Sequence, residues 1–104
     1  MSEVTLTSYD EVPYESKPLY STHPDCLAVA ARLRGLAAPH ASRCRVLELG
    51  CAGGGNLIPL AYALPESTFV GVDLSPRQIA DGQQVCDRLG LQNIKLRAAS
   101  IADI

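Results

Sequence analysis

The chain has 104 residues, 47 % of them hydrophobic and 19 % charged, which is enough for one globular domain and too apolar for a disordered segment. Its net charge is −2 and neither sign is clustered, which argues against a nucleic-acid surface and a polybasic membrane anchor. The four cysteines form no C-x-x-C pair, so we expect no metal site and a reducing compartment. The sequence shows neither a signal-peptide pattern nor an apolar run of membrane length, so we expect a cytoplasmic protein.

The first part of the chain differs in texture from the rest. Residues 1–21 are polar and carry two prolines and three tyrosines, and we expect them to form an extended arm or lid. Residues 22–104 are predicted to form a partial ligand-binding domain. A helix is expected at its start, with Thr22 as the N-cap, Pro24 in the first turn and apolar residues at helical spacing up to Gly35.

Strand-like and helical segments then alternate. Ser75 followed by proline predicts a helix start, and Gly90 predicts the end of that helix. The order predicts two crossover units, which form the N-terminal half of an α/β, Rossmann-like doubly wound parallel sheet with flanking helices, three strands and the order 3-2-1. The predicted segments are strand 45–49, helix 56–64, strand 68–73, helix 76–89 and strand 93–99.

The first strand is expected to lie at the centre of a complete fold of this kind. It reads as a near-continuous apolar run, which is typical of a parallel sheet covered on both faces. Because the sequence stops soon after the third strand, one edge of strand 45–49 has no predicted partner. We therefore expect the chain to be a fragment, and we expect self-association or strand exchange to cover this edge.

The stretch VLELGCAGGGN, residues 46–56, combines a glycine-rich turn with an acid, Glu48, in the strand before it. Such a turn lets a ligand approach the backbone, although glycines also serve tight turns. A second acid, Asp73, ends the next strand 23 positions after Gly50, near the distance expected for an acid that binds ribose hydroxyls. The alternatives are that Asp73 starts a turn and that an arginine or a loop amide partners Glu48.

The ligand class depends on Ala52. In a dinucleotide-binding motif this position holds the glycine that lets a pyrophosphate touch the backbone, and the alanine methyl group would crowd it. An adenosine ligand with an amino-acid end explains both acids better. Glu48 would then lie near its ammonium group, and Asp73 would bind its ribose.

With these residues, VLELGCAGGGN resembles the E/D-x-G-x-G-x-G motif of class I S-adenosylmethionine-dependent methyltransferases. FVGVDLSPRQI is similar to the second signature of that family, in which the acid binds the ribose and the following leucine packs on the adenine. NIKLRAASIADI is similar to the third, where serine replaces the acid that commonly meets the adenine amino group. The resemblance and the neighbouring residues imply these cofactor-binding candidates: Glu48, Gly50, Cys51, Ala52, Gly54, Asn56, Asp73, Leu74, Gln78, Ser100 and Ile101.

The resemblance implies the cofactor-binding part of a methyltransferase, with S-adenosyl-L-methionine as its cofactor. The arm YDEVPYESKPLY resembles that of bacterial enzymes that carry a methyltransferase regulatory domain. Residues for the methyl acceptor usually come from the fourth strand onward, so no catalytic residue is assigned, the acceptor stays open, and the chain alone is expected to be inactive. Two other classes remain: an NAD(P)-binding domain of an oxidoreductase, and a non-catalytic interaction module.

Some polar residues carry two interpretations. Gln78 lies one turn into a helix and is a ligand candidate, although a solvated helix face is favoured for its residue type. Tyr14, Tyr20 and His23 are candidates for closing over the ligand, and packing of the arm is the alternative. His40 is expected in a surface loop.

Overall fold

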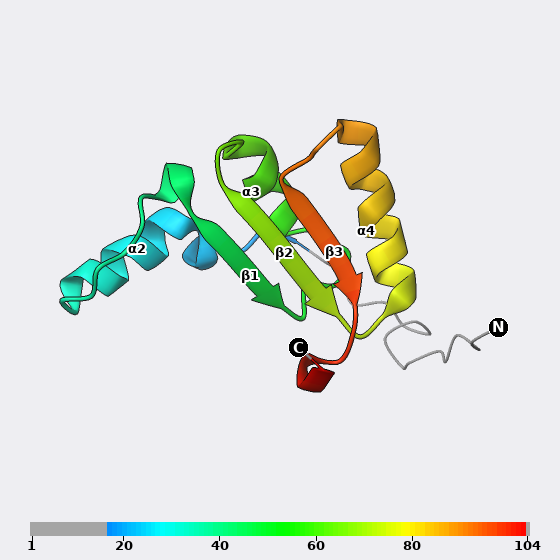
Figure 1. The fold of residues 1–104 in the computed structure, drawn as a ribbon, viewed down its shortest axis with the longest axis horizontal. Coiled ribbons are helices and arrows are strands. Elements are labelled where there is room, and N and C mark those ends of the chain that lie inside the picture. The colour runs from blue at the N-terminus through cyan, green and yellow to red at the C-terminus, as the bar shows by residue number, and fades with distance from the viewer. Residues whose placement is uncertain (1–16, 104) are drawn as a thin grey trace.

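The computed structural model describes residues 17–103 and contains one sheet of three parallel strands in the order β1-β2-β3 (Figure 1). The strands are β1 (Arg45–Leu49), β2 (Thr68–Asp73) and β3 (Ile94–Ala98). Both strand pairs are parallel. The predicted fold class and strand order are therefore confirmed.

Residues 17–103 also form three α-helices and three short 3-10 helices, and two of the α-helices connect the strands. Ser75 accepts the Gln78 N–H at the start of the helix before β3, and Gly90 ends that helix with φ 68°, as the sequence predicts. The bounds are α2 Pro24–Leu33, α3 Leu57–Ala63, α4 Pro76–Leu89, η1 Tyr20–Thr22, η2 Ala41–Arg43 and η3 Ile101–Asp103.

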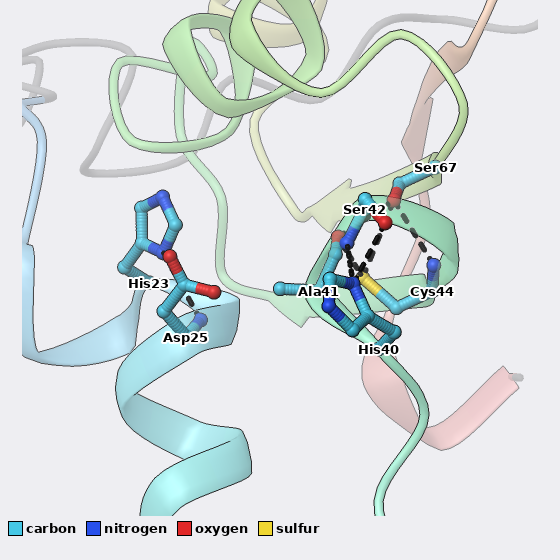
Figure 2. Close-up of polar contacts among 7 residues, drawn as sticks. All are labelled: His23, Asp25, His40, Ala41, Ser42, Cys44 and Ser67. Atoms are coloured by element: carbon cyan, nitrogen blue, oxygen red, sulfur yellow. Dashed lines mark hydrogen bonds and ion pairs between the residues drawn. The ribbon is translucent and has the colours of Figure 1, made fainter.

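The start of α2 differs from the prediction. Its N-cap is His23, whose Nδ1 accepts the Asp25 N–H at 3.0 Å, whereas Thr22 lies in the turn before it (Figure 2). His40 makes the same kind of contact at η2, where its Nδ1 accepts the Ser42 N–H at 3.2 Å. The ring of His23 is thus used at a helix start. Tyr14 and the rest of residues 1–16 lie outside the described part of the chain.

Helices cover one face of the sheet within residues 17–103. In Figure 1, α3 and α4 both lie against this face, whereas α2 extends away from the sheet. The core is built from alternate strand residues, from α3 and α4 and from one residue of the glycine turn: Phe69, Ile94, Leu96, Leu57, Ile58, Leu60, Ala61, Ile79, Cys86 and Cys51.

The opposite face of the sheet is mostly exposed, although Val72 of β2 on that face is buried. Leu47 and Val70 are paired in register across β1 and β2, and both are exposed, with Leu49 beside them. The surrounding side chains on this face include exposed Arg45, Lys95 and Arg97. The expectation that the sheet is covered on both faces is therefore wrong for the described residues. Of the apolar residues of β1, Val46 packs against the covered core, whereas Leu47 and Leu49 are exposed on the other face.

Buried polar groups fix the amino ends of the strands. Ser67, directly before β2, accepts the Cys44 N–H at 3.0 Å and so joins the starts of β1 and β2 (Figure 2). Asn93, directly before β3, donates through Nδ2 to the carbonyl oxygens of Ala61, Leu64 and Ser67. With the amino ends held in this way, the carboxyl ends of the strands form the opposite edge of the sheet, where ligands bind in folds of this type.

Candidate functional site

A pocket of about 480 Å³ lies at the carboxyl ends of the strands. This volume is within the range of about 300–1,000 Å³ that is common for small-molecule sites. Seven of the eleven predicted binding residues line it, and Ala99 is a lining residue that the sequence did not single out. The lining consists of Gly50, Ala52, Asp73, Leu74, Gln78, Ala99, Ser100 and Ile101.

Asp73 is the charged residue of this lining, and two backbone amides orient it. Its Oδ1 accepts the Ala52 N–H at 3.1 Å, and its Oδ2 accepts the Ser75 N–H at 3.0 Å. A carboxylate oxygen has two lone pairs, so each oxygen keeps capacity for a further donor. The carboxylate is therefore held in one orientation at the pocket and is able to accept hydrogen bonds from ligand hydroxyl groups.

Four backbone amides of the glycine turn donate to acceptors inside the protein. Gly50 and Cys51 both donate to the Val72 carbonyl, at 2.7 and 3.1 Å. Gly54 donates to the Cys51 carbonyl at 3.0 Å, and Ala52 donates to the aspartate described above. A phosphate-binding turn needs such amides to point at the ligand. Four amides of this turn are already bonded, so the turn is not arranged as a phosphate cradle.

Ala52 has a left-handed backbone, with φ 51°. Gly50 and Gly54 on either side of it have φ 76° and 81°. This conformation is common for glycine and costs a residue with a Cβ atom about 1–2 kcal/mol. The alanine that replaces the middle glycine of the motif therefore follows the turn that the motif requires.

Two glycines outside the motif let other elements approach this turn. A Cβ atom at Gly71 of β2 would lie 2.7 Å from the Cys51 Sγ, and one at Gly82 of α4 would lie 2.5 Å from the Gly53 carbonyl oxygen. Sequence analysis did not assign either residue to the site. A glycine inside a strand or a helix is the available signal, because it often marks a close backbone approach.

Cys51 lies behind the lining and is almost fully buried. Burial raises its pKa from 9.0 to about 12, with further contributions from the nearby carboxylates of Asp73 and Glu48. The thiol is therefore protonated at neutral pH and serves as a packed side chain.

Glu48 and Asn56 were predicted to bind ligand, and they contact each other. Asn56 is buried, and its Nδ2 donates to the Glu48 Oε2 at 2.5 Å. The sequence left open whether an arginine or a loop amide partners Glu48, and the partner is a side-chain amide. Glu48, Asn56, Cys51 and Gly54 all lie outside the pocket lining.

The rest of the pocket lining includes Gln78 and the apolar residues Leu74 and Ile101. Gln78 is buried and lines the pocket, so the favoured solvated helix face is wrong for this residue. Leu74 follows β2 and Ile101 begins η3, and both expose more than half of their surface although they line the pocket. Ser100 lies beside Ile101 in the lining. These residues offer apolar surface for a flat ring.

Comparison with known proteins decides the family. A family model described as a methyltransferase domain matches residues 40–104, which contain both strand–turn–helix units and the whole pocket lining. The chain belongs to the methyltransferase domain family. This confirms the family predicted from the sequence motifs.

Several relatives of this methyltransferase domain are much longer than the chain. It is 51 % identical over 96 residues to the uncharacterized protein RP789 of Rickettsia prowazekii, covering 92 % of the chain and 17 % of that protein. It is 43 % identical over 61 residues to the ribosomal RNA small subunit methyltransferase G of Chlorobium limicola, covering 59 % of the chain and 28 % of that protein. The structure of PKMT2 from Rickettsia typhi in complex with AdoHcy matches with a TM-score of 0.81 and 36 % identity, over 88 % of the chain and 18 % of PKMT2. The chain thus spans under a fifth of RP789 and of PKMT2.

No helix within residues 17–103 has the length and apolar character needed to cross a bilayer. No group of three His, Cys, Asp or Glu side chains in that range has the arrangement of a metal site.

Proposed function

We propose that this methyltransferase domain binds S-adenosyl-L-methionine in the pocket at the carboxyl ends of β2 and β3. The main support for the proposal is the hydrogen bonding around the glycine turn, where backbone amides are bonded inside the protein and a carboxylate faces the pocket. The amides of Gly50, Cys51, Ala52 and Gly54 are bonded internally, and the charged group that lines the pocket is the Asp73 carboxylate. This arrangement disfavours a diphosphate and favours a ligand with hydroxyl groups and positive charge.

The lining supports one placement of the cofactor. The ribose hydroxyls would donate to Asp73, and the adenine would pack against Leu74 and Ile101 with Ser100 beside it. The amino-acid end would then point toward the turn and Glu48. The solved complex of PKMT2 with AdoHcy, a protein 36 % identical to the chain, supports the same ligand class.

S-adenosylmethionine carries an activated methyl group on its sulfonium, which a nucleophile can accept. The residues of this chain would contribute binding, orientation and exclusion of water. We assign no catalytic residue within the chain, and we propose that the 104 residues alone do not transfer methyl groups.

Calorimetric titration with S-adenosylhomocysteine and with NADH tests the proposal against the two other classes. We expect saturable binding of S-adenosylhomocysteine alone. Binding of NADH alone would support an oxidoreductase domain, and binding of neither ligand would support an interaction module.

A charge-removing pair of variants tests the role of Asp73. Asp73→Asn should weaken S-adenosylhomocysteine binding at least about tenfold, because hydrogen bonds to a charged acceptor are worth about 1.5–3 kcal/mol. Asp81→Asn is the matched control, since Asp81 is exposed on α4 and does not line the pocket. Equal binding by the two variants would contradict this placement of the ribose.

A further inference from the structure

Asn56 immediately precedes α3, yet its side chain does not cap that helix. Within residues 17–103 its side chain makes three hydrogen bonds, all to residues outside α3. Its Oδ1 accepts the Leu19 N–H at 2.7 Å, and its Nδ2 donates to the Thr22 Oγ1 at 3.0 Å and to the Glu48 Oε2 at 2.5 Å. We call these three contacts the Asn56 bridge. An N–H needs an acceptor and a carboxylate needs a donor, so one orientation of the amide satisfies both.

The Asn56 bridge fixes a turn of the N-terminal segment to the sheet. Within that turn, the Leu19 carbonyl accepts both the Thr22 N–H, at 3.1 Å, and the Thr22 hydroxyl, at 2.9 Å. Leu19 lies 37 residues before Asn56 in the chain. Glu48 belongs to β1 and pairs in register with Gly71 of β2. The bridge therefore connects the segment before α2 to β1 near the carboxyl end of that strand.

The partner of Glu48 preserves its charge. An arginine would cancel the negative charge of a partly buried carboxylate, whereas a neutral amide orients the carboxylate and leaves the charge in place. Within residues 17–103 the structure shows no ion pair to Glu48. The Glu48 carboxylate also helps to raise the pKa of the Cys51 thiol, after burial and Asp73.

We infer that Asn56 is a positioning residue, which orients the Glu48 carboxylate toward a cationic ligand group and holds Leu19–Thr22 beside it. This inference rests on the proposed function and names the ammonium of the amino-acid end as the group that Glu48 recognises. Asn56 itself acts through Glu48 and through the docked segment. Binding of the adenosine end depends on other residues, those around Asp73 and Leu74.

The first test measures backbone amide exchange of the full chain by NMR without ligand. In Asn56→Leu the Leu19 N–H loses its acceptor, and we expect its exchange to become at least about tenfold faster while the Val70 amide of β2 is unchanged. Unchanged exchange at Leu19 would overturn the bridge. Thr22→Val is a second variant outside the core, and it should accelerate exchange at Leu19 several-fold if Asn56→Leu does not fold.

A reversal variant separates the bridge from general packing. Asn56→Asp places a carboxylate against Glu48 and should loosen the Leu19–Thr22 segment. Adding Glu48→Gln supplies an amide donor on the other side, which restores the contact in the opposite sense and should restore protection at Thr22. Lack of any rescue in the double variant would contradict a direct contact between the two side chains.

The second test compares two ligands by calorimetry. S-adenosylhomocysteine carries the amino-acid end, and 5′-methylthioadenosine lacks it. Asn56→Leu should weaken binding of S-adenosylhomocysteine at least about tenfold and that of 5′-methylthioadenosine less than about twofold. Equal losses for the two ligands would overturn the positioning role. If the wild-type chain binds neither ligand, the proposed function and the ligand half of this inference fail together, while exchange at Leu19 still decides the bridge.

Discussion

The two faces of the sheet come from alternate residues of the same strands, yet their surroundings differ. Leu96 of β3 lies among α3, α4 and the glycine turn and is 8 % exposed, whereas Leu47 of β1 on the other face is 56 % exposed. The pocket depends on the covered face, because Gly71 and Gly82 pack against the turn from that side. Apolar strand sequence thus marks which residues form the sheet, and helix placement decides which of them form the core.

The two faces should differ most in how much a leucine-to-alanine substitution lowers the free energy of unfolding. Leu96→Ala should lower the free energy of unfolding by about 2–5 kcal/mol, because it leaves a cavity in the core. Leu47→Ala should lower it by less than about 1 kcal/mol, since its side chain is mostly exposed. Urea denaturation of both variants measures the difference. Equal costs would mean that the open face is covered in solution.

A smaller effect is expected from adding one methyl group on the covered face. Gly71→Ala would place a Cβ atom 2.7 Å from the Cys51 Sγ and 2.8 Å from the Leu96 side chain, so we expect a loss of about 1–3 kcal/mol. At Gly53 the nearest atom would lie 3.7 Å away, and Gly53→Ala should be nearly neutral. Thermal unfolding of the two variants compares them. A neutral Gly71→Ala would show that the turn is not tightly packed on β2.

The pH dependence of the free energy of unfolding tests the burial of Cys51 against β2 without adding an atom at Gly71. Unfolded Cys51 loses its proton near its ordinary pKa of 9.0, whereas the folded thiol keeps it up to about 12. The folded state therefore binds more protons in this window, and its stability should fall by on the order of 1.4 kcal/mol per pH unit from this group. Below pH 9 the Cys51 thiol is protonated in both states, so its full contribution to the free energy of unfolding is present there.

Urea denaturation at several pH values from 8.5 to about 11 compares wild type with Cys51→Ala, in which this loss should be absent. The pKa of Cys86 is also raised by burial, and its contribution is present in both proteins. Parallel curves for the two proteins would indicate that water reaches the Cys51 thiol.

Substitutions on the exposed face of the sheet should have the smallest effect on the free energy of unfolding. Their expected effect is on self-association of the chain. We predict self-association through the outer edge of β1, which has no strand partner within residues 17–103. Leu47→Lys should change the free energy of unfolding by only about 0.5 kcal/mol and shift the equilibrium toward monomer. Sedimentation measures this shift, and Glu66→Lys, an exposed change outside the strands, is its control. A monomeric wild-type chain would contradict the prediction.

Much of the fold could be predicted because its signals are local. The bounds of β1 and β2 follow from short apolar runs, and α4 follows from Ser75, Pro76 and Gly90. Asp73 could be placed at the site because the carboxyl end of a parallel strand is where ligands bind. Each of these signals spans only a few residues, so the rest of the chain does not alter it.

The remaining features depend on contacts between distant residues. Asn56 meets Leu19 across 37 positions, and no local pattern indicates that pairing. Gln78 was expected to face solvent from its residue type, but the approach of α4 to the glycine turn buries it. His23 replaced Thr22 as the cap of α2 because Thr22 is engaged by Asn56. Tertiary contacts thus override local preference at the places where the site is assembled.

Asn93 carries a consequence for how the chain folds. Its single amide group shares two hydrogens among three carbonyl oxygens, which belong to the end of α3 and to the segment before β2. These partners lie 26 to 32 residues earlier in the chain. Release of β3 would leave those carbonyls without their donor, so separate melting of the two crossover units is disfavoured. Asn93, directly before the last strand, thereby couples β3 to the segment from α3 to the start of β2.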